Sequence, residues 1–355
     1  MKVGIWNETR RGDPRLLLLP EEIQRLRDLG CEVLIERGAG SGMHIPDSRL
    51  EEAGANIVEN AQQLTEEAEI LLCLGMPSLA EIESYPMDKV LIGLLQVWRH
   101  EQQVQALSQK SWTLFALEHV PRTLQAQNID VFSAMAALSG YASVMLAAAH
   151  ARRALAPFSI GGTKLDSAQV VVIGATAAGM YAAQTAQRLG ARVVVYDTRP
   201  DSRRKIQRIG AIAFIPTGDS NPESEKWKKY LQEADIVITA LFAPDQPAPK
   251  VFSAEWRQHL RPGSVVVDAA ADFGGNCSEV SPGENTEIDG VKIVAPLRLA
   301  ASVPFHASRL LSRSFARFLS FFQLSDGQLI PHANHPILQS TCVRWRGRLL
   351  LQFPS

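Results

Sequence analysis

Short apolar runs alternate with amphipathic stretches from the first residues of the chain. Runs of three to six residues that are rich in Val, Ile and Leu, and that polar segments bound, predict buried strands. In the first 120 residues these runs are Val3–Trp6, Glu32–Glu36, Ile57–Glu59, Ile70–Leu74, Val90–Leu95 and Thr113–Ala116. Helical periodicity lies between them, as in Pro20–Leu29 and Ser48–Ala53. The alternation predicts a doubly wound, parallel sheet.

A second series of the same kind begins at Gln169. Its apolar runs are Val170–Ile173, Val193–Tyr196, Ala213–Ile215, Ile236–Thr239, Val265–Asp268 and Ile293–Ala295. Six short strands separated by helices or long loops are typical of a Rossmann sheet. We therefore predict an α/β protein with two Rossmann-like, doubly wound parallel-sheet domains joined by long helices.

Two helices are expected to connect these domains. The apolar segment from Val131 to about Leu155 leads out of the first series, and the amphipathic segment Ala307–Phe322 follows the second. Turns are expected at Asp326-Gly327 and Arg346-Gly347, so the tail is expected to return to the first domain. The predicted domains are residues 1–130 plus 305–355, and residues 131–304.

Composition narrows the classes of function. The formal net charge is −1 over 355 residues, which gives no general reason to expect a nucleic-acid partner. The four cysteines contain no C-x-x-C pair, which argues against disulfides or a zinc site and suits a reducing cytoplasm. His332 and His335 lie between prolines without a completing carboxylate or cysteine, so no metal is expected.

The segment Val131–Ala151 is long and apolar, so it could be a transmembrane helix or a buried helix. Ala and Gly dominate it where a membrane span would favour Leu and Ile. We expect a buried, closely packed helix, and no membrane insertion of this chain. The first residues run directly into a predicted strand, so no signal peptide is expected.

The stretch Val170–Pro200 has the layout of a dinucleotide-binding unit. A strand leads to a turn with Gly174 and Gly179, a helix over Met180–Leu189 follows, and a second strand ends at Asp197. The glycines permit a tight turn and close helix–strand packing, and the pyrophosphate of a dinucleotide would lie at the helix N-terminus. The carboxylate about 20 residues further on is placed to bind the adenosine ribose.

Two residues complicate this interpretation. Thr176 stands where the middle glycine is expected, and a β-branched residue there costs room and resists positive φ. Asp197 favours NAD over NADP because a carboxylate repels a 2′-phosphate, but Arg199 lies only two residues away. A turn that packs well and binds nothing remains the alternative.

Polar and charged residues gather at Pro121–Asp130, just before the long apolar helix. Taken alone, Asp130 or Asn128 could be helix N-caps, and Arg122 a surface charge. The order and spacing of the residues in and after this cluster are more informative than their individual types. The chain has Val120-Pro121-Arg122, Ala126-Gln127, Asp130, Ser133, Met135-Ala136 and Ser139-Gly140-Tyr141.

This run resembles the signature of the NAD(H)-binding alpha component of proton-translocating nicotinamide nucleotide transhydrogenase. Alanine dehydrogenase shares that fold. The later stretches that agree are Asp197-Thr198-Arg199-Pro200, Pro247-Ala248-Pro249, Gly263–Asp268, Gly274-Gly275-Asn276-Cys277 and Pro282-Gly283-Glu284. The order and spacing match from Gly4 to about Leu350.

The resemblance implies that Arg122, Gln127, Asp130 and Ser133 line the nicotinamide end of an NAD(H) site. It also implies that the arginine and the aspartate form a pair that orients the ring and its amide. Direct hydride transfer needs two nicotinamides face to face and no proton-transferring residue. The residues that we expect at the rest of the NAD site are Gly174, Ala175, Thr176, Ala178, Gly179, Asp197, Thr198, Arg199, Thr239, Ala240, Leu241 and Asn276.

The implied function is to present NADH for direct hydride transfer to NADP⁺ on a partner subunit. The implied partners are the NADP-binding and membrane subunits of a transhydrogenase, with a homodimer of this chain. The implied location is the cytoplasm, peripheral at the inner membrane through those subunits.

A free-standing alanine or amino-acid dehydrogenase is the first alternative. Such an enzyme needs an arginine for its substrate carboxylate, a lysine and a histidine. Arg15 and Asp272 match family positions, but Cys73-Leu74-Gly75 stands where the lysine is expected and Gln96 where the histidine is expected. That chemistry therefore lacks two of its groups.

A homologue that has lost nucleotide affinity is the second alternative. Thr176 replaces a glycine, and Pro216–Glu233 is shorter than the mobile loop of the family and lacks its Gly-Tyr-Ala-Lys-Glu-Met element. A small-residue and arginine segment is also altered at Leu297–Val303. All three changes concern nucleotide handling and leave the scaffold intact.

Overall fold

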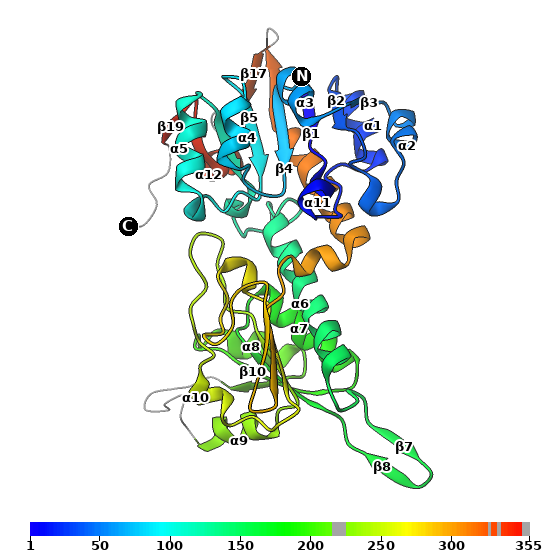
Figure 1. The fold of residues 1–355 in the computed structure, drawn as a ribbon, viewed down its shortest axis with the longest axis vertical. Helices are drawn as coiled ribbons and strands as arrows, with labels where there is room; N and C mark the ends of the chain where they lie inside the picture. Colours follow the sequence, from blue (N-terminus) through cyan, green and yellow to red (C-terminus); the bar gives the residue numbers. More distant parts are fainter. Residues whose placement is uncertain (215–224, 326–327, 332–334, 350–355) are drawn as a thin grey trace. The chain divides into compact units, whose positions relative to one another are not determined.

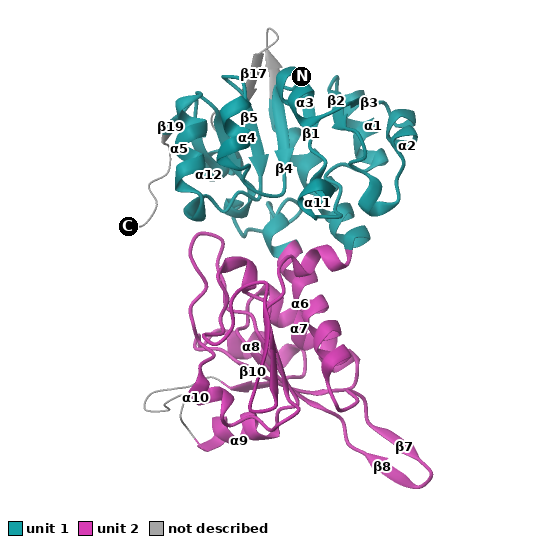
Figure 2. Cartoon of the chain, in the orientation of Figure 1, with its two compact units in different colours: residues 1–134, 304–355 teal, residues 135–303 magenta. Residues whose placement is uncertain are grey.

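The structure is a computed structural model that describes residues 1–214, 225–325, 328–331 and 335–349. Contacts between Cα atoms divide the chain into two units (Figure 2). Unit 1 comprises Met1–Ala134 and Pro304–Ser355, and unit 2 comprises Met135–Val303. The boundaries predicted from sequence, 130/131 and 304/305, compare with 134/135 and 303/304 in the structure.

Unit 1 is built on an eight-stranded sheet of order β19-β18-β6-β5-β4-β1-β2-β3 (Figure 1). The strands β1 to β6 are parallel, whereas β18 pairs antiparallel with β6 and β19. Their bounds are β1 Lys2–Ile5, β2 Glu32–Glu36, β3 Ala55–Val58, β4 Ile70–Cys73, β5 Val90–Gly93, β6 Thr113–Ala116, β18 Cys342–Trp345 and β19 Arg348–Leu349. The return of the tail follows directly from the β18–β6 pairing.

Helices link these strands. They are α1 Pro20–Asp28, α2 Asp47–Glu52, α3 Ala61–Glu67, α4 Leu79–Ser84, α5 Glu101–Gln109, α11 Pro304–Leu319 and α12 Pro336–Thr341. After α11, the strands β16 (Phe322–Ser325) and β17 (Gln328–Pro331) pair with each other. The predicted turn at Arg346-Gly347 is confirmed, with positive φ at both residues, and the one at Asp326-Gly327 lies outside the described residues.

Unit 2 is built on a seven-stranded sheet of order β11-β10-β9-β12-β13-β15-β14. Of these seven described strands, only β14 runs antiparallel. The bounds are β9 Gln169–Ile173, β10 Arg192–Tyr196, β11 Ile212–Phe214, β12 Ile236–Thr239, β13 Val265–Asp268, β14 Asn285–Ile288 and β15 Val291–Val294. The helices are α6 Val131–His150, α7 Ala177–Arg188, α8 Ser202–Arg208, α9 Glu225–Glu233 and α10 Ala254–Arg257.

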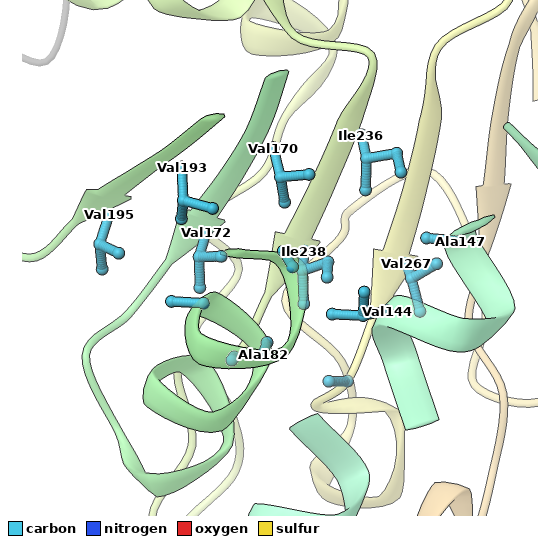
Figure 3. Packing of buried hydrophobic residues seen from close by; sticks show 14 of the residues in the cluster. Val144, Ala147, Val170, Val172, Ala182, Val193, Val195, Ile236, Ile238 and Val267 are labelled. Atoms are coloured by element: carbon cyan, nitrogen blue, oxygen red, sulfur yellow. The ribbon is translucent and has the colours of Figure 1, made fainter. Parts of the chain in front are cut away.

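The core of unit 2 shows why small residues dominate its helices. Val170, Val172 and Ile238 point from the sheet toward Ala182 of α7 and Val144 of α6 (Figure 3). A Cβ added to Gly140 of α6 would lie 2.0 Å from the carbonyl oxygen of Ala178. The two helices therefore approach each other too closely for any side chain at position 140.

The predicted fold class is confirmed: both sheets are mostly parallel and carry helices. Each contains the 3-2-1-4-5-6 strand order of a doubly wound sheet, with extra strands at an edge. Some strands were not predicted. Among them, β14 is polar and partly exposed, and the projecting hairpin of β7 (Phe158–Ile160) and β8 (Thr163–Leu165) is exposed throughout (Figure 1).

The helix predicted over Val131–Leu155 ends early, at His150. The carbonyl groups of Ala154 and Leu155 accept from the N–H of Ala168 and so do not continue the helix. Among the described residues, α6 is the one helix that could cross a membrane by length and composition, and half of that stretch is buried within the protein.

Candidate nucleotide-binding site

The sheet of unit 2 reverses its strand order between β9 and β12. The chain moves outward from β9 to β10 and β11, and then returns to place β12 on the other side of β9. In doubly wound sheets ligands bind in the crevice beyond the carboxyl ends of the two strands at this point. The β9–α7 turn and the segment that follows β12 form that end of the sheet.

The glycines of the β9–α7 turn have the geometry that the sequence predicts. Gly174 has a φ of +105°, a conformation that L side chains rarely adopt. A Cβ on Gly179 would lie 1.8 Å from the carbonyl oxygen of Gly174. Both positions therefore require glycine, and the first turn of α7 presents its N–H groups beyond β9.

Thr176 is accommodated without backbone strain, because its φ is −72° and it is the N-cap of α7. The expectation that this position needs positive φ is wrong. The Oγ1 atom accepts from the N–H of Gly179 at 3.3 Å and donates to the carbonyl oxygen of Ala240 at 2.7 Å. The hydroxyl thus joins the turn after β9 to the residue after β12, across the end of the sheet where a dinucleotide would bind.

A buried side-chain amide, that of Asn276, fixes the backbone just after β12, where Leu241 is predicted to line the NAD site. Asn276 accepts from the N–H of Leu241 at 2.9 Å and donates to the carbonyl groups of Leu241 and Pro249. The hydroxyl of Thr239 donates to Asp268 at 3.0 Å, and both residues are buried. Thr239 and Asn276 therefore shape the backbone near the turn and direct their polar atoms to protein partners.

Asp197 lies at the carboxyl end of β10 and is only 1% exposed. Its Oδ2 accepts from the N–H of Ala175 at 2.7 Å and from Arg199 Nη2 at 2.9 Å. Its Oδ1 accepts from the backbone N–H and Nε of Arg199 and from the hydroxyl of Ser202. Burial raises the pKa of Asp197, but the hydrogen bonds from Arg199 and Ala175 outweigh it and hold the pKa below its ordinary value.

The four residues predicted at the nicotinamide end lie in unit 1. Arg122 is exposed and stands over the ring of Phe132, with 5.6 Å between the guanidinium carbon and the ring centroid. The carboxylate of Asp130 accepts from the N–H of Ser133 at 2.9 Å and so caps α6. Gln127 is exposed on the same loop.

No ion pair between Arg122 and Asp130 is present in the described part of the chain, contrary to what the resemblance implies. The reason is local, because Asp130 caps the helix while the guanidinium of Arg122 lies over the ring of Phe132. The two alternatives left open from sequence, a capping aspartate and a surface arginine, describe this geometry.

The residues compared with alanine dehydrogenase are held by protein groups. Arg15 is buried and forms two side-chain hydrogen bonds with Asp13, at 2.8 and 2.6 Å. The thiol of Cys73 is fully buried, and burial raises its pKa. The carboxylate of Asp272 accepts from the backbone N–H of Arg298. Arg15 and Asp272 thus have protein partners, and a buried thiol stands where the lysine of a dehydrogenase is expected.

One titratable residue of unit 1 with a shifted pKa, Glu118, was not predicted from the sequence. Glu118 is buried and accepts from the N–H groups of Leu95 and Gln96, at 3.0 and 2.6 Å. Gln96 has a φ of +44°, so the carboxylate holds a turn that is otherwise unfavourable. Burial raises the pKa of Glu118 to about 7. Glu118 ends the apolar run that contains β6, two residues after the strand itself, and this position is the sequence feature that could have indicated it.

No cluster of three or more metal-binding side chains occurs among the residues that the structure describes. Of the segment Pro216–Glu233, residues 225–233 form helix α9, which buries Trp227 and Leu231, and residues 216–224 lie outside the described residues.

Two family models match the chain. The alanine dehydrogenase/PNT N-terminal domain matches residues 4–139, and the C-terminal domain of the same family matches residues 143–352. The chain belongs to the alanine dehydrogenase/PNT family. Among curated members, it is similar to the first portion of the NAD(P) transhydrogenase alpha subunit of Rhodospirillum rubrum, with 31% identity over 99% of this chain and 98% of the relative. It is 33% identical to alanine dehydrogenase of Mycobacterium tuberculosis over 79% of this chain and 75% of that protein.

Two solved structures are similar to this chain over nearly its whole length. The transhydrogenase of Sinorhizobium meliloti superposes with a TM-score of 0.86 at 32% identity, with 98% of each chain covered. An L-alanine dehydrogenase superposes with a TM-score of 0.82 at 23% identity, over 98% of this chain and 96% of the other. The second likeness supports the fold alone.

Proposed function

We propose that this chain is the NAD(H)-binding component of a nicotinamide nucleotide transhydrogenase and presents NADH for direct hydride transfer to NADP⁺ on a partner subunit. The observation that carries the proposal is the contrast between two sets of residues. The β9–α7 turn keeps two of the three glycines of a dinucleotide-binding turn, Gly174 and Gly179. At the same time Gln96 and Cys73 stand where a dehydrogenase would carry its proton-transferring groups.

The residues of unit 2 fit NAD(H) at the pyrophosphate. The N-terminus of α7 favours an anion. Gly174 and Gly179 allow the tight turn and the close helix–strand packing that place this N-terminus beyond β9. Thr198 and Arg199 are exposed beyond β10 and are proposed to contact the adenosine ribose. When bound, NADH supplies the hydride, so the protein only has to position it and exclude side reactions.

Gln127 is proposed as a positioning residue for the transfer. Its amide does not ionise at neutral pH, so it can position a ligand without acting as an acid or a base, and it is exposed on the loop before α6. Gln127→Asn should lower the rate of hydride transfer by about tenfold or more, because small misplacement of reacting groups is costly. NADH affinity, measured by nicotinamide fluorescence, should change far less. Gln125→Asn, two residues earlier on the same exposed loop, is the matched control. Equal losses of rate and affinity in Gln127→Asn would count against a positioning role.

The partners belong to this proposal. NADP⁺ is bound by a separate subunit, proton coupling resides in membrane subunits, and this chain forms a homodimer at the cytoplasmic side of that assembly. The chain's own contribution is the bound NADH and the exposed loop that carries Arg122 and Gln127.

Two assays on the full chain test the proposal. Pyruvate, ammonia and NADH should give no turnover, whereas the NADP-binding component of a family member should restore hydride transfer from NADH. Turnover of pyruvate by the chain alone would favour the dehydrogenase interpretation. Failure to bind millimolar NADH would favour a homologue without nucleotide affinity.

A further inference from the structure

A cavity of about 280 Å³ lies within unit 1, between helices α1 and α11 and the loop before α6. That volume is just below the range of roughly 300–1,000 Å³ typical of pockets for drug-sized ligands, so a small molecule fits. Its described polar lining consists of Glu22, Arg25, Asn128, Arg313, Arg317 and Ser320. Positive charge therefore predominates, with three guanidinium groups against one carboxylate.

Two of these arginines lie on one face of α11. Arg313 and Arg317 are four residues apart, so they are separated by one helical turn. Ala316, which also lines the cavity, contributes only a methyl group and leaves room beside them. Both arginines are exposed, and among the residues that the structure describes neither guanidinium group forms a hydrogen bond or an ion pair. Like charges at this spacing repel each other, so an anion between them would relieve the repulsion.

The third arginine, Arg25, comes from α1 and is oriented by a buried carboxylate. Its Nη1 atom donates to Glu22 Oε1 at 2.9 Å, and the Glu22 side chain is only 6% exposed. The Arg25 side chain is 70% exposed. The guanidinium group has five N–H donors, and Glu22 uses one of them. Glu22 therefore fixes the direction of Arg25 and leaves four donors for a ligand.

Buried hydrogen bonds hold α11 against the start of α1. The Oγ atom of Ser312, which directly precedes Arg313, accepts from the N–H of Leu19 at 2.8 Å, and Leu19 is the N-cap of α1. One turn earlier, Ser308 Oγ accepts from the N–H of Leu16 at 2.9 Å. The backbones that carry the three arginines are therefore fixed relative to each other before a ligand arrives, which lowers the cost of binding.

We propose that this cavity binds a small polyanion with two or more phosphate or carboxylate groups, held by Arg25, Arg313 and Arg317. Guanidinium groups bind both kinds of oxyanion through paired N–H donors, and three of them match a ligand with several negative charges. The side-chain amide of Asn128 adds a neutral donor. None of the residues that line the cavity is among those expected to bind the dinucleotide, so the inference does not depend on the proposed function.

Calorimetric titration of the full chain with pyrophosphate and with citrate tests the inference. At least one of the two should bind saturably with a dissociation constant below about 1 mM, and the tighter one identifies the kind of oxyanion. Orthophosphate should bind about tenfold more weakly or worse, because a single phosphate group cannot engage three guanidinium groups at once. The affinity should fall as the salt concentration rises, since ion pairs at an exposed site are screened.

Substitutions on α11 assign the binding to this cavity. The double variant Arg313→Gln, Arg317→Gln should weaken binding of the probe by about tenfold or more, because it removes two of the three cations. Arg313→Lys alone should keep part of the affinity, since it retains the charge and loses the planar pair of donors. Arg309→Gln is the matched control, because Arg309 is exposed one turn before Arg313 and does not line the cavity. It should change the affinity by less than about threefold.

The same variants test a purely structural role for the arginines. Arg25 and Arg317 lie in the last turns of their helices, where a cation is stabilising by itself. If that were their whole role, the double variant would lose free energy of unfolding and bind the probe with unchanged affinity, which would overturn the inference. Failure of both probes to bind, or an equal loss of affinity in Arg309→Gln, would also overturn it. NADH affinity should be unchanged in the double variant, so each of these outcomes leaves the proposed function intact.

Discussion

Thr176 performs two tasks with one hydroxyl group. It caps α7 and it joins the β9–α7 turn to the residue after β12. A glycine in its place would free the space in which a pyrophosphate approaches the backbone. The residue therefore stabilises the empty site at some cost in affinity for the dinucleotide.

Two substitutions of Thr176 should separate these effects. Thr176→Gly should tighten NADH binding by roughly threefold or more, because it opens the approach to the turn. Thr176→Ala should leave affinity closer to that of the native chain but lower the free energy of unfolding by about 1–2 kcal/mol, because it removes the cap. Fluorescence titration and urea unfolding provide the two measurements. Thr176→Ser, which keeps the hydroxyl, is the control, and weaker NADH binding by Thr176→Gly would contradict this account.

Glu118 gives the fold a dependence on pH. Burial raises its pKa from the ordinary value of 4.5 to about 7, so between these values the folded chain holds a proton that the unfolded chain has released. Stability is therefore fully present below about pH 4.5 and is lost as the pH rises through 7.

Glu118→Gln should remove this dependence. The native chain should lose free energy of unfolding between pH 4.5 and 7 by an amount on the order of 3 kcal/mol relative to the variant. Chemical unfolding at a series of pH values measures it, with Glu101→Gln, an exposed acid at the start of α5, as the control. Parallel curves for Glu118→Gln and the native chain would show that Glu118 titrates normally.

Residue identities indicated the site only in part. Gly174, Gly179 and Asp197 could be found from sequence because strand, turn and spacing are local features. The hydrogen bonds that Ala175 and Ser202 donate to Asp197 could not, because these two residues reach it only once β9, β10 and α8 are packed together. The same is true of Glu118, whose partners Leu95 and Gln96 lie 23 and 22 residues before it.

At the scale of elements, the crossing of α6 and α7 depends on Gly140. The Ala178 carbonyl occupies the position that a Cβ at residue 140 would take. Because α7 carries the candidate pyrophosphate site, any displacement of α7 from α6 also displaces the β9–α7 turn.

Gly140→Ala should lower the free energy of unfolding by about 1–3 kcal/mol through overpacking, and should weaken NADH binding as well. Gly75→Ala is the matched control, since a Cβ there meets nothing within 4 Å and the backbone needs no positive φ. Thermal unfolding of the two variants compares them. Equal midpoints would show that the helices separate without cost.

The buried elements could be predicted and the exposed ones could not. β2, β6, β10, β12 and β13 match their predicted bounds to within a residue, because each is a buried run of apolar residues. The hairpin β7–β8 consists of exposed three-residue strands. In β14 exposed positions alternate with partly buried ones. Neither segment therefore contains the run of apolar residues by which a strand is recognised.

At the scale of the molecule, unit 1 is closed by residues from both ends of the sequence. The hydroxyl groups of Ser308 and Ser312 on α11 accept from the backbone N–H groups of Leu16 and Leu19, at 2.9 and 2.8 Å. Both serines are fully buried. The strand β18 adds a second connection through its pairing with β6.

Removal of either hydroxyl should leave a buried N–H group without an acceptor. Ser308→Ala and Ser312→Ala should each lower the free energy of unfolding by about 1–3 kcal/mol. Urea unfolding measures the change, and Ser320→Ala, an exposed serine bonded locally to Arg317, should have little effect. A midpoint unchanged in all three variants would show that water replaces the lost acceptor.

The placement of unit 2 within the sequence of unit 1 has a consequence for biosynthesis. Thr113 and Arg346, which are hydrogen-bonded in unit 1, are 233 residues apart. At about 5–20 residues per second the ribosome needs roughly 10–50 s to make the intervening chain. Throughout that time β6 lacks its β18 partner, whereas all the described strands of unit 2 are synthesised before β18. Pulse proteolysis of ribosome-bound chains should therefore find unit 2 protected before unit 1, and the first half of unit 1 is the segment of the nascent chain most in need of a chaperone.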